Sequence, residues 1–190
     1  MQNKRKNYKQ KRLGIKLIAL GIVLCAVAVL FTYQVEPTVS DICDYKCKIL
    51  AYDLYEKESV KKYAAYTDLD KLLQESDIIT LHMPANESNY HMIDKNAIEK
   101  MKKGVLIINT ARGALINSND LIEEIECGKV GGAALDVVEK ELGLYYNDLR
   151  SEVLDNRELA ILKSFPNVVV TPHMAFYTEN AVGDMVKHSL

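Results

Sequence analysis

The chain has 190 residues, of which 48% are hydrophobic and 26% are charged, and these ordinary values fit one globular core with at most a small appendage. The formal net charge is −2, but residues 1–16 hold seven of the 24 bases and no acid, which leaves 17 bases against 26 acids in the rest. An acidic body argues against nucleic-acid binding, whereas the basic arm over 1–16 suits anionic lipid headgroups.

An uncharged hydrophobic run follows the basic arm. Residues 17–33 read LIALGIVLCAVAVLFTY, and a helix of that length would span about 25 Å, close to the hydrocarbon core of a bilayer. With Arg12 and Lys16 just before it, the run predicts a transmembrane helix over 17–35 with its N-terminus in the cytoplasm, and therefore single-pass membrane association. A cleaved signal peptide and a buried helix of the folded domain are the alternatives.

The rest of the chain predicts a linker and one domain. Residues 36–46 are a short polar connection, and the domain follows over 47–190. Strands are predicted over 49–52, 77–82, 105–109, 132–136 and 168–171, and helices over 69–75, 94–103, 157–163 and 178–188. Asp68 or Thr67 lies near the start of the helix over 69–75. A further helix is capped by Ser118 or Asn119, runs to Cys127 and is ended by Gly128. Strands that alternate with helices of about ten residues indicate βαβ units and a parallel sheet with helices on both faces.

Polar residues follow every predicted strand. In open α/β sheets, ligands bind beyond the carboxyl ends of the strands. The residues at these positions are Asp53, His82 to Pro84, Thr110 to Arg112, Asp136, and Pro172 with His173. The planar guanidinium of an arginine can hold a carboxylate in two hydrogen bonds, and a histidine held by a carboxylate can give or take a hydroxyl proton. This combination suits hydride transfer to a keto acid.

The cysteines predict no metal site. Cys43 and Cys47 have the spacing of half a metal site, but neither they nor Cys127 have a histidine at ligand spacing, and Cys25 lies in the hydrophobic run. Reduced thiols without a structural disulfide are therefore the better interpretation.

Five strings carry a resemblance to a known family: CKILAYD, SDIITLHMP, MKKGVLIINTARGALIN, GKVGGAALDVVEKE and FPNVVVTPHMAFYTENAV. From Cys47 onward, the chain resembles the NAD-binding domain of the D-isomer-specific 2-hydroxyacid dehydrogenases, and it looks closest to the D-lactate dehydrogenases and related vancomycin-resistance enzymes. The resemblance implies a Rossmann-like α/β fold, NAD as cofactor, a small 2-keto or 2-hydroxy acid such as pyruvate as substrate, a cytoplasmic location and a homodimer.

The same resemblance implies a role for each matched residue. Arg112 would clamp the substrate carboxylate and polarise the keto group, and His173 would be the general acid. Glu141 would pair with His173; Glu139 competes for that pairing, and spacing favours Glu141. The remaining matches are Asp53 at the adenosine ribose, Met83 and Pro84 on the adenine side, Asn89, Thr110 and Ala111 beside the cofactor, Asp136 at the nicotinamide amide and Tyr177 near the substrate pocket. A carboxylate at Asp53 would favour NAD over NADP, because a 2′-phosphate would meet a negative charge.

The chain departs from the family in its N-terminal part. The Gly-x-Gly-x-x-Gly loop belongs about 20 residues before Asp53, but residues 30–36 read LFTYQVE. The first strand and helix of the cofactor domain and the separate substrate domain have no counterpart either. We therefore expect a partial Rossmann-like parallel sheet preceded by a single hydrophobic helix, with exposed apolar edges near 49–52 and 105–108. The expected function is an enzyme fragment of weak or no activity, or alternatively a membrane-tethered non-catalytic remnant or interaction module.

Overall fold

A computed structural model describes residues 27–30, 47–141, 144, 156–175, 177, 182 and 187 of the chain. Its strands are β1 (Val27–Leu30), β2 (Ile49–Tyr52), β3 (Ala65–Tyr66), β4 (Ile78–Leu81), β5 (Val105–Asn109), β6 (Val130–Leu135) and β7 (Val168–Val170). Its helices are α3 (Leu69–Glu75), α4 (Lys95–Lys100), α5 (Ser118–Glu126) and α6 (Arg157–Ser164), with short 3₁₀ turns η1 (Val60–Lys62) and η2 (Gly113–Leu115). The strands and helices predicted between residues 49 and 171 are present with small shifts at their ends. Most of the predicted helix over 178–188 lies outside the described residues.

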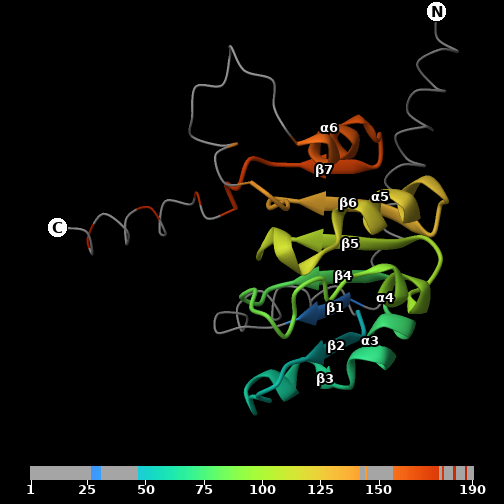
Figure 1. Cartoon of the computed structure of the whole chain (residues 1–190). Helices are drawn as coiled ribbons and strands as arrows, with labels where there is room; N and C mark the ends of the chain where they lie inside the picture. Colours follow the sequence, from blue (N-terminus) through green and yellow to red (C-terminus); the bar gives the residue numbers. More distant parts are fainter. Residues whose placement is uncertain are drawn as a thin grey trace, which may run out of the picture.

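All the described strands belong to one parallel sheet in the order β3-β2-β1-β4-β5-β6-β7 (Figure 1). From β1 in the middle of the sheet, the strands run outward to β3, and then from β4, on the other side of β1, outward to β7. This is the strand order of a doubly wound dinucleotide-binding fold, with the switch of direction between β1 and β4. The predicted Rossmann-like α/β class is therefore confirmed.

The place of β1 corrects the prediction for the N-terminal part of the chain. Val27–Leu30 pairs with β2 on one side and β4 on the other, with Val29 in register with Ala51 and Thr80. These four residues lie inside the hydrophobic run predicted as a helix over 17–35, yet they form the central strand. The physical reason is that a strand covered on both faces needs the same uninterrupted apolar composition as a buried or membrane helix. The predicted domain start at residue 47 therefore leaves out a strand of the sheet.

The same pairing overturns the predicted exposed edges. β2 lies between β1 and β3, and β5 lies between β4 and β6, so neither strand is at an edge. The remaining parts of the predicted basic arm, hydrophobic helix and linker, at 1–26 and 31–46, lie outside the described residues. Among the helices in the described part of the chain, none has the length and apolar character needed to span a bilayer.

Side-chain caps set the starts of the helices. Asp68 accepts a hydrogen bond from the Lys71 amide at the start of α3, and Asp94 accepts one from the Ala97 amide at the start of α4, both at 2.8 Å. Asn117, rather than the predicted Ser118 or Asn119, caps α5. A polar side chain at such a position satisfies an amide that the helix itself leaves unpaired. The sequence signals for these helices are therefore local ones.

The core lies on both faces of the sheet. Consecutive residues of a strand point to opposite faces, and the consecutive residues Ile79, Thr80 and Leu81 of β4 are all buried. Ile49, Leu50 and Ala51 of β2 are buried as well, so both faces are covered there. Helix α3 contacts α4, α4 contacts α5, and α5 contacts α6, so the four helices form a continuous row along the sheet. The parallel pairing of the strands brings their carboxyl ends to one edge of the sheet.

Replacing Val29 by proline tests the central position of β1. Because both neighbouring strands pair with β1, a missing N–H at Val29 leaves a carbonyl of β2 or β4 without its partner. We expect Val29→Pro to lower the free energy of unfolding of the full chain by about 1–3 kcal/mol more than Val29→Ala does, because the alanine variant keeps the N–H. Urea unfolding followed by circular dichroism measures both; equal losses in the two variants would contradict the central pairing.

Candidate active site

The predicted site residues gather at the carboxyl edge of the sheet. Because the strands are parallel, their arrowheads point to the same side (Figure 1). Asp53 follows β2, Met83 follows β4, Arg112 follows β5, Asp136 follows β6 and His173 follows β7. The described part of this edge has a cavity beside β2 and β4. Charged groups lie beside β5, β6 and β7, and we call them the charged cluster: Arg112, Asp136, Glu139, Glu141 and His173.

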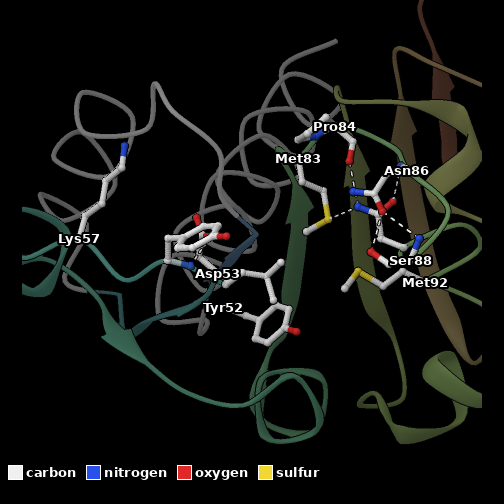
Figure 2. A pocket seen from close by; sticks show the side chains of 11 residues that line it. Tyr52, Asp53, Lys57, Met83, Pro84, Asn86, Ser88 and Met92 are labelled. Atoms are coloured by element: carbon white, nitrogen blue, oxygen red, sulfur yellow. Dashed lines mark hydrogen bonds between the residues drawn. The ribbon is translucent and has the colours of Figure 1, made fainter.

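The cavity has a volume of about 520 Å³ and is largely lined by apolar side chains. Tyr52 and Asp53 border it on one side, and Met83, Pro84 and Met92 border it on the other (Figure 2). An apolar slot with one carboxylate at its rim suits a flat heterocycle joined to a sugar.

Asp53 is set for such a ligand by a local turn. One of its carboxylate oxygens accepts a hydrogen bond of 3.0 Å from the Tyr55 amide, which fixes the direction of the side chain. An ionised carboxylate has about four acceptor positions, so further acceptor capacity remains for hydroxyl groups. Next to it, Leu54 and Tyr55 are 78% and 81% exposed, which is unusual for large apolar side chains and places apolar surface at the cavity rim.

Asn89 has a structural task in this cavity. Its amide nitrogen donates to the Pro84 carbonyl at 2.9 Å, and its amide oxygen accepts from the Asn86 amide at 2.8 Å. The side chain therefore closes the loop that carries Met83 and Pro84, in addition to lining the cavity. The predicted contact of Asn89 with a cofactor stays a prediction.

The loop that carries Arg112 is held by Asn109, which sequence reasoning missed. Asn109 ends β5 and is 1% exposed; its side chain accepts from the Ala111 amide at 3.0 Å and donates to the Arg112 carbonyl at 2.9 Å. These two bonds fix the turn while the Arg112 side chain stays exposed, as does Thr110. The only sequence signal for this role is a single polar residue that ends the apolar run of β5.

Gly113 brings the Arg112 loop against the next one. A Cβ atom at this position would lie 2.1 Å from the carbonyl oxygen of Val138, so any side chain here would push the two loops apart. The glycine that follows Arg112 is therefore a packing requirement.

His173 and Glu141 form the central contact of the charged cluster. The His173 Nδ1 lies 2.9 Å from a carboxylate oxygen of Glu141, and the side chains are 34% and 18% exposed. The structure thus places Glu141, and not Glu139, against His173. His173 itself adopts a positive φ of 52°, a conformation that costs energy for a residue with a side chain and therefore needs support from its surroundings.

Asp136 supplies that support. It is 4% exposed, its Oδ1 accepts from the Thr171 hydroxyl and from the Met174 amide at 2.8 Å, and its Oδ2 accepts from the Ala175 amide at 2.7 Å. Its carbonyl also accepts from the His173 amide at 2.9 Å. Both carboxylate oxygens are therefore used to hold the turn around His173, a role that the predicted contact with a nicotinamide amide did not include. Tyr177 follows this turn and is 67% exposed.

Two carboxyl groups of the cluster have lowered pKa values. Burial raises the pKa of Asp136, but the hydrogen bonds from Thr171, Ala175 and Met174 together outweigh burial and hold the pKa below its ordinary value. Burial likewise raises the pKa of Glu139, whereas hydrogen bonds from His91 and Ser118 outweigh it and lower the pKa. Both groups are therefore held in the ionised form by donors that folding brings to them.

The residues fit two parts of NAD and not the part between them. The cavity with Asp53 fits an adenosine. Arg112 and the Glu141–His173 pair, which follow neighbouring strands, have the chemistry of a reacting centre. The sequence, however, has no glycine from residue 22 to residue 103, so the segment that follows β1 lacks the glycines that normally let a backbone approach a pyrophosphate. The fit is therefore incomplete at the phosphates.

Acid should destabilise the fold through Asp136 and Glu139. Because their folded pKa values are lowered, their contribution to stability is complete above the ordinary carboxyl range, about pH 5, and is lost as the pH falls through the lowered values. Thermal unfolding of the full chain between pH 7 and pH 3 should show this slope, and Asp136→Asn should flatten it. Asp70→Asn, which removes an exposed carboxylate paired with Lys100, is the control. An equal slope in both variants would contradict the assignment.

Comparison with known proteins gives the family. Residues 38–175 match the model described as D-isomer specific 2-hydroxyacid dehydrogenase, NAD binding domain. An aromatic 2-oxoacid reductase of Clostridium sporogenes is 53% identical over 143 residues, which cover 75% of this chain and 43% of the relative. A D-lactate dehydrogenase of Lactiplantibacillus plantarum is 42% identical over 175 residues, which cover 91% of this chain and 53% of the relative.

Solved structures agree with this result. A D-lactate dehydrogenase of Treponema pallidum is similar with a TM-score of 0.83 and 34% identity, over 88% of this chain and 51% of that one. The D-lactate dehydrogenase of Lactobacillus jensenii with NAD⁺ gives a TM-score of 0.82 and 31% identity over the same shares. The chain spans about half the length of the relatives it matches. It belongs to the D-isomer-specific 2-hydroxyacid dehydrogenase family, of which its body is the NAD-binding domain.

Proposed function

We propose that the chain carries the reaction centre of an NAD-dependent D-2-hydroxyacid dehydrogenase that reduces a 2-keto acid, and that its own activity is weak. The observation that carries the proposal is the contact of 2.9 Å between His173 Nδ1 and Glu141, on the loop against which the Arg112 turn packs through Gly113. A general acid, its orienting carboxylate and a carboxylate-binding guanidinium thus come from adjacent strand ends.

Each residue has a separate task in this reaction. The Arg112 guanidinium binds the carboxylate of the keto acid in two hydrogen bonds and draws electron density from the keto oxygen. Glu141 accepts from His173 Nδ1, which makes Nε2 the nitrogen that gives its proton to the developing alkoxide. Asp136 holds the turn that aims the imidazole. When bound, NADH supplies the hydride.

The substrate class follows from these groups and from the relatives. A guanidinium next to an acid imidazole recognises a carboxylate with a neighbouring carbonyl, which is the common part of all 2-keto acids. Relatives include enzymes named for D-lactate and for aromatic 2-oxoacids, so pyruvate and phenylpyruvate are the acids to compare. By the same family relationship, we expect the chain to act as a homodimer.

The incomplete phosphate site favours a second candidate, a non-catalytic NAD-binding module. Backbone amides at a glycine-rich turn normally hold the pyrophosphate. Without that turn, the affinity for the dinucleotide falls, and turnover falls with it at any given concentration of NADH. The two candidates differ in one measurement: oxidation of saturating NADH by the full chain with pyruvate or phenylpyruvate, followed by absorbance, occurs only if the reaction centre works.

Turnover should depend on Arg112 and His173. Arg112→Lys keeps the charge but loses one of two charge-assisted hydrogen bonds, so kcat/KM for the keto acid should fall about 10- to 100-fold. His173→Gln removes the acid and should lower kcat about 10²- to 10⁴-fold without weakening NADH binding. Lys102→Ala, which removes an exposed pair with Asp77, is the control. Near-normal rates in either site variant, measured at saturating NADH, would reject these roles.

NADH should bind weakly because the phosphates add little. Losing two charge-assisted hydrogen bonds at about 1.5–3 kcal/mol each corresponds to a loss of roughly 10²- to 10⁴-fold in affinity. We therefore expect adenosine and NADH to bind the full chain with dissociation constants within about tenfold of each other, and Asp53→Ala to weaken both. Calorimetry measures all of these values; micromolar binding of NADH with a much weaker adenosine would show a substitute phosphate site.

A further inference from the structure

The loop after β6 carries three acids that face in two directions. Asp136 and Glu141 both hold His173, the first through its turn and the second through its ring. Glu139, between them, turns away from His173. One of its carboxylate oxygens lies 2.6 Å from His91 Nε2, and the other accepts from the Ser118 amide at 2.8 Å. The loop is therefore held to the histidine turn on one side and to the rest of the domain on the other.

His91 belongs to a segment that is paired with the chain after Arg112. The His91 amide donates to the Ala114 carbonyl at 2.9 Å, and two residues later Ile93 forms a parallel bridge with Ile116. His91 has a positive φ of 52°, and its ring stacks on Tyr90 with 3.8 Å between centroids. The imidazole is thus fixed relative to the Arg112 turn before it meets Glu139.

The contacts of Glu139 continue through its backbone. Its carbonyl accepts a hydrogen bond of 3.1 Å from the side chain of Asn156, the residue that caps α6. Its amide nitrogen would lie 2.7 Å from a Cβ atom at position 113, which marks the close approach of the Arg112 turn. Glu139 therefore joins the segment of His91, the start of α5, the start of α6 and the Arg112 turn.

We propose that Glu139 and His91 are positioning residues, which together fix the loop over 136–141 against the segment that follows Arg112 and so set Arg112 relative to the Glu141–His173 pair. The inference rests on the proposed function for its role in turnover, but the geometry it describes can be measured without turnover. Neither Glu139 nor His91 is proposed to contact the substrate or the cofactor.

The His91–Glu139 pair is shielded to about the same extent as the His173–Glu141 pair and far more than the nearby pair of Lys95 and Glu123. The His91 and Glu139 side chains are 25% and 18% exposed, whereas those of Lys95 and Glu123, which join the start of α4 to α5, are 51% and 61% exposed. Exposed pairs contribute little because water and salt screen them. A shielded carboxylate with two donors holds its loop more firmly, and its removal leaves the Ser118 amide without its acceptor.

The test replaces Glu139 and follows the His173–Glu141 contact directly. In the full chain labelled with ¹⁵N-histidine, the proton between His173 Nδ1 and Glu141 gives a downfield NMR signal, assigned by its loss in His173→Gln. We expect Glu139→Ala to broaden or shift this signal while the far-ultraviolet circular dichroism stays unchanged. Glu139→Gln keeps an oxygen for the Ser118 amide and an NH₂ for His91 Nε2, so it should restore most of the signal. Where NADH oxidation is measurable, Glu139→Ala should lower kcat about 10- to 100-fold with little change in KM.

The matched control is Glu123→Ala, which removes an exposed glutamate of α5 that pairs with Lys95. It should leave the signal and the rate unchanged. His91→Leu removes only the ring contact and serves if Glu139→Ala does not fold; it should perturb the same signal. A folded Glu139→Ala or His91→Leu chain with the unaltered signal overturns the positioning role. If the unaltered chain does not oxidise NADH but Glu139→Ala still changes the NMR signal, the proposed function is rejected and this inference is kept.

Discussion

The pairing of β1 with both β2 and β4 is the constraint on which the other parts of the site depend. In the described sheet, β3 and β2 form one side and β4 to β7 form the other, and β1 is the strand that joins them. Asp53 follows β2, whereas Arg112, Asp136 and His173 follow β5 to β7. Without β1, Asp53 and the groups after β5 to β7 would lie on two separate sheets with no fixed relation. Four residues of the N-terminal hydrophobic run thus relate the two halves of the proposed cofactor site.

The loop after β6 shows how one residue type can hold several neighbouring segments. Asp136, Glu139 and Glu141 are all carboxylates within six residues, but each meets different donors. Asp136 meets backbone amides and a hydroxyl, Glu139 meets His91 and a helix amide, and Glu141 meets His173. Carboxylates suit this purpose because each has two oxygens and several acceptor positions. The cost of burying these carboxylates is offset by donors that come from other segments of the fold.

The sequence was sufficient where the signals are local and failed where they are tertiary. The capping residues Asp68 and Asp94 and the glycine after α5, Gly128 with a φ of 74°, allowed the helices to be placed within a few residues. β1 was missed because an apolar run has no periodicity that separates a central strand from a buried or membrane helix, and its partners lie 22 or more residues further along the chain.

The candidate site residues also fall into those that local sequence strings predicted and those that only the tertiary fold brings together. The strings around Arg112 and His173 and the spacing of Glu141 gave the charged cluster. His91 with Glu139, Asn109 and Thr171 escaped, because the first pair is separated by 48 residues and the others look like ordinary strand ends. Only the parallel sheet brings such residues together, and no pattern within a single segment encodes the contact.

The lack of a glycine after β1 affects binding and chemistry differently. The pyrophosphate grip normally supplies affinity and fixes the distance between the adenosine and the nicotinamide, but it makes no contact with the keto acid. The groups that we propose to act on the keto acid are Arg112, Glu141 and His173. Asn109, Gly113 and Asp136 fix the turns that carry or pack against them, and these three residues follow or end β5 and β6. In our proposal, the missing glycines lower occupancy by the dinucleotide and widen its range of positions. The contacts that hold the Arg112 and His173 turns come instead from residues at the ends of β5, β6 and β7. The proposed site for the keto acid therefore depends less on the missing glycines than the proposed site for the cofactor does.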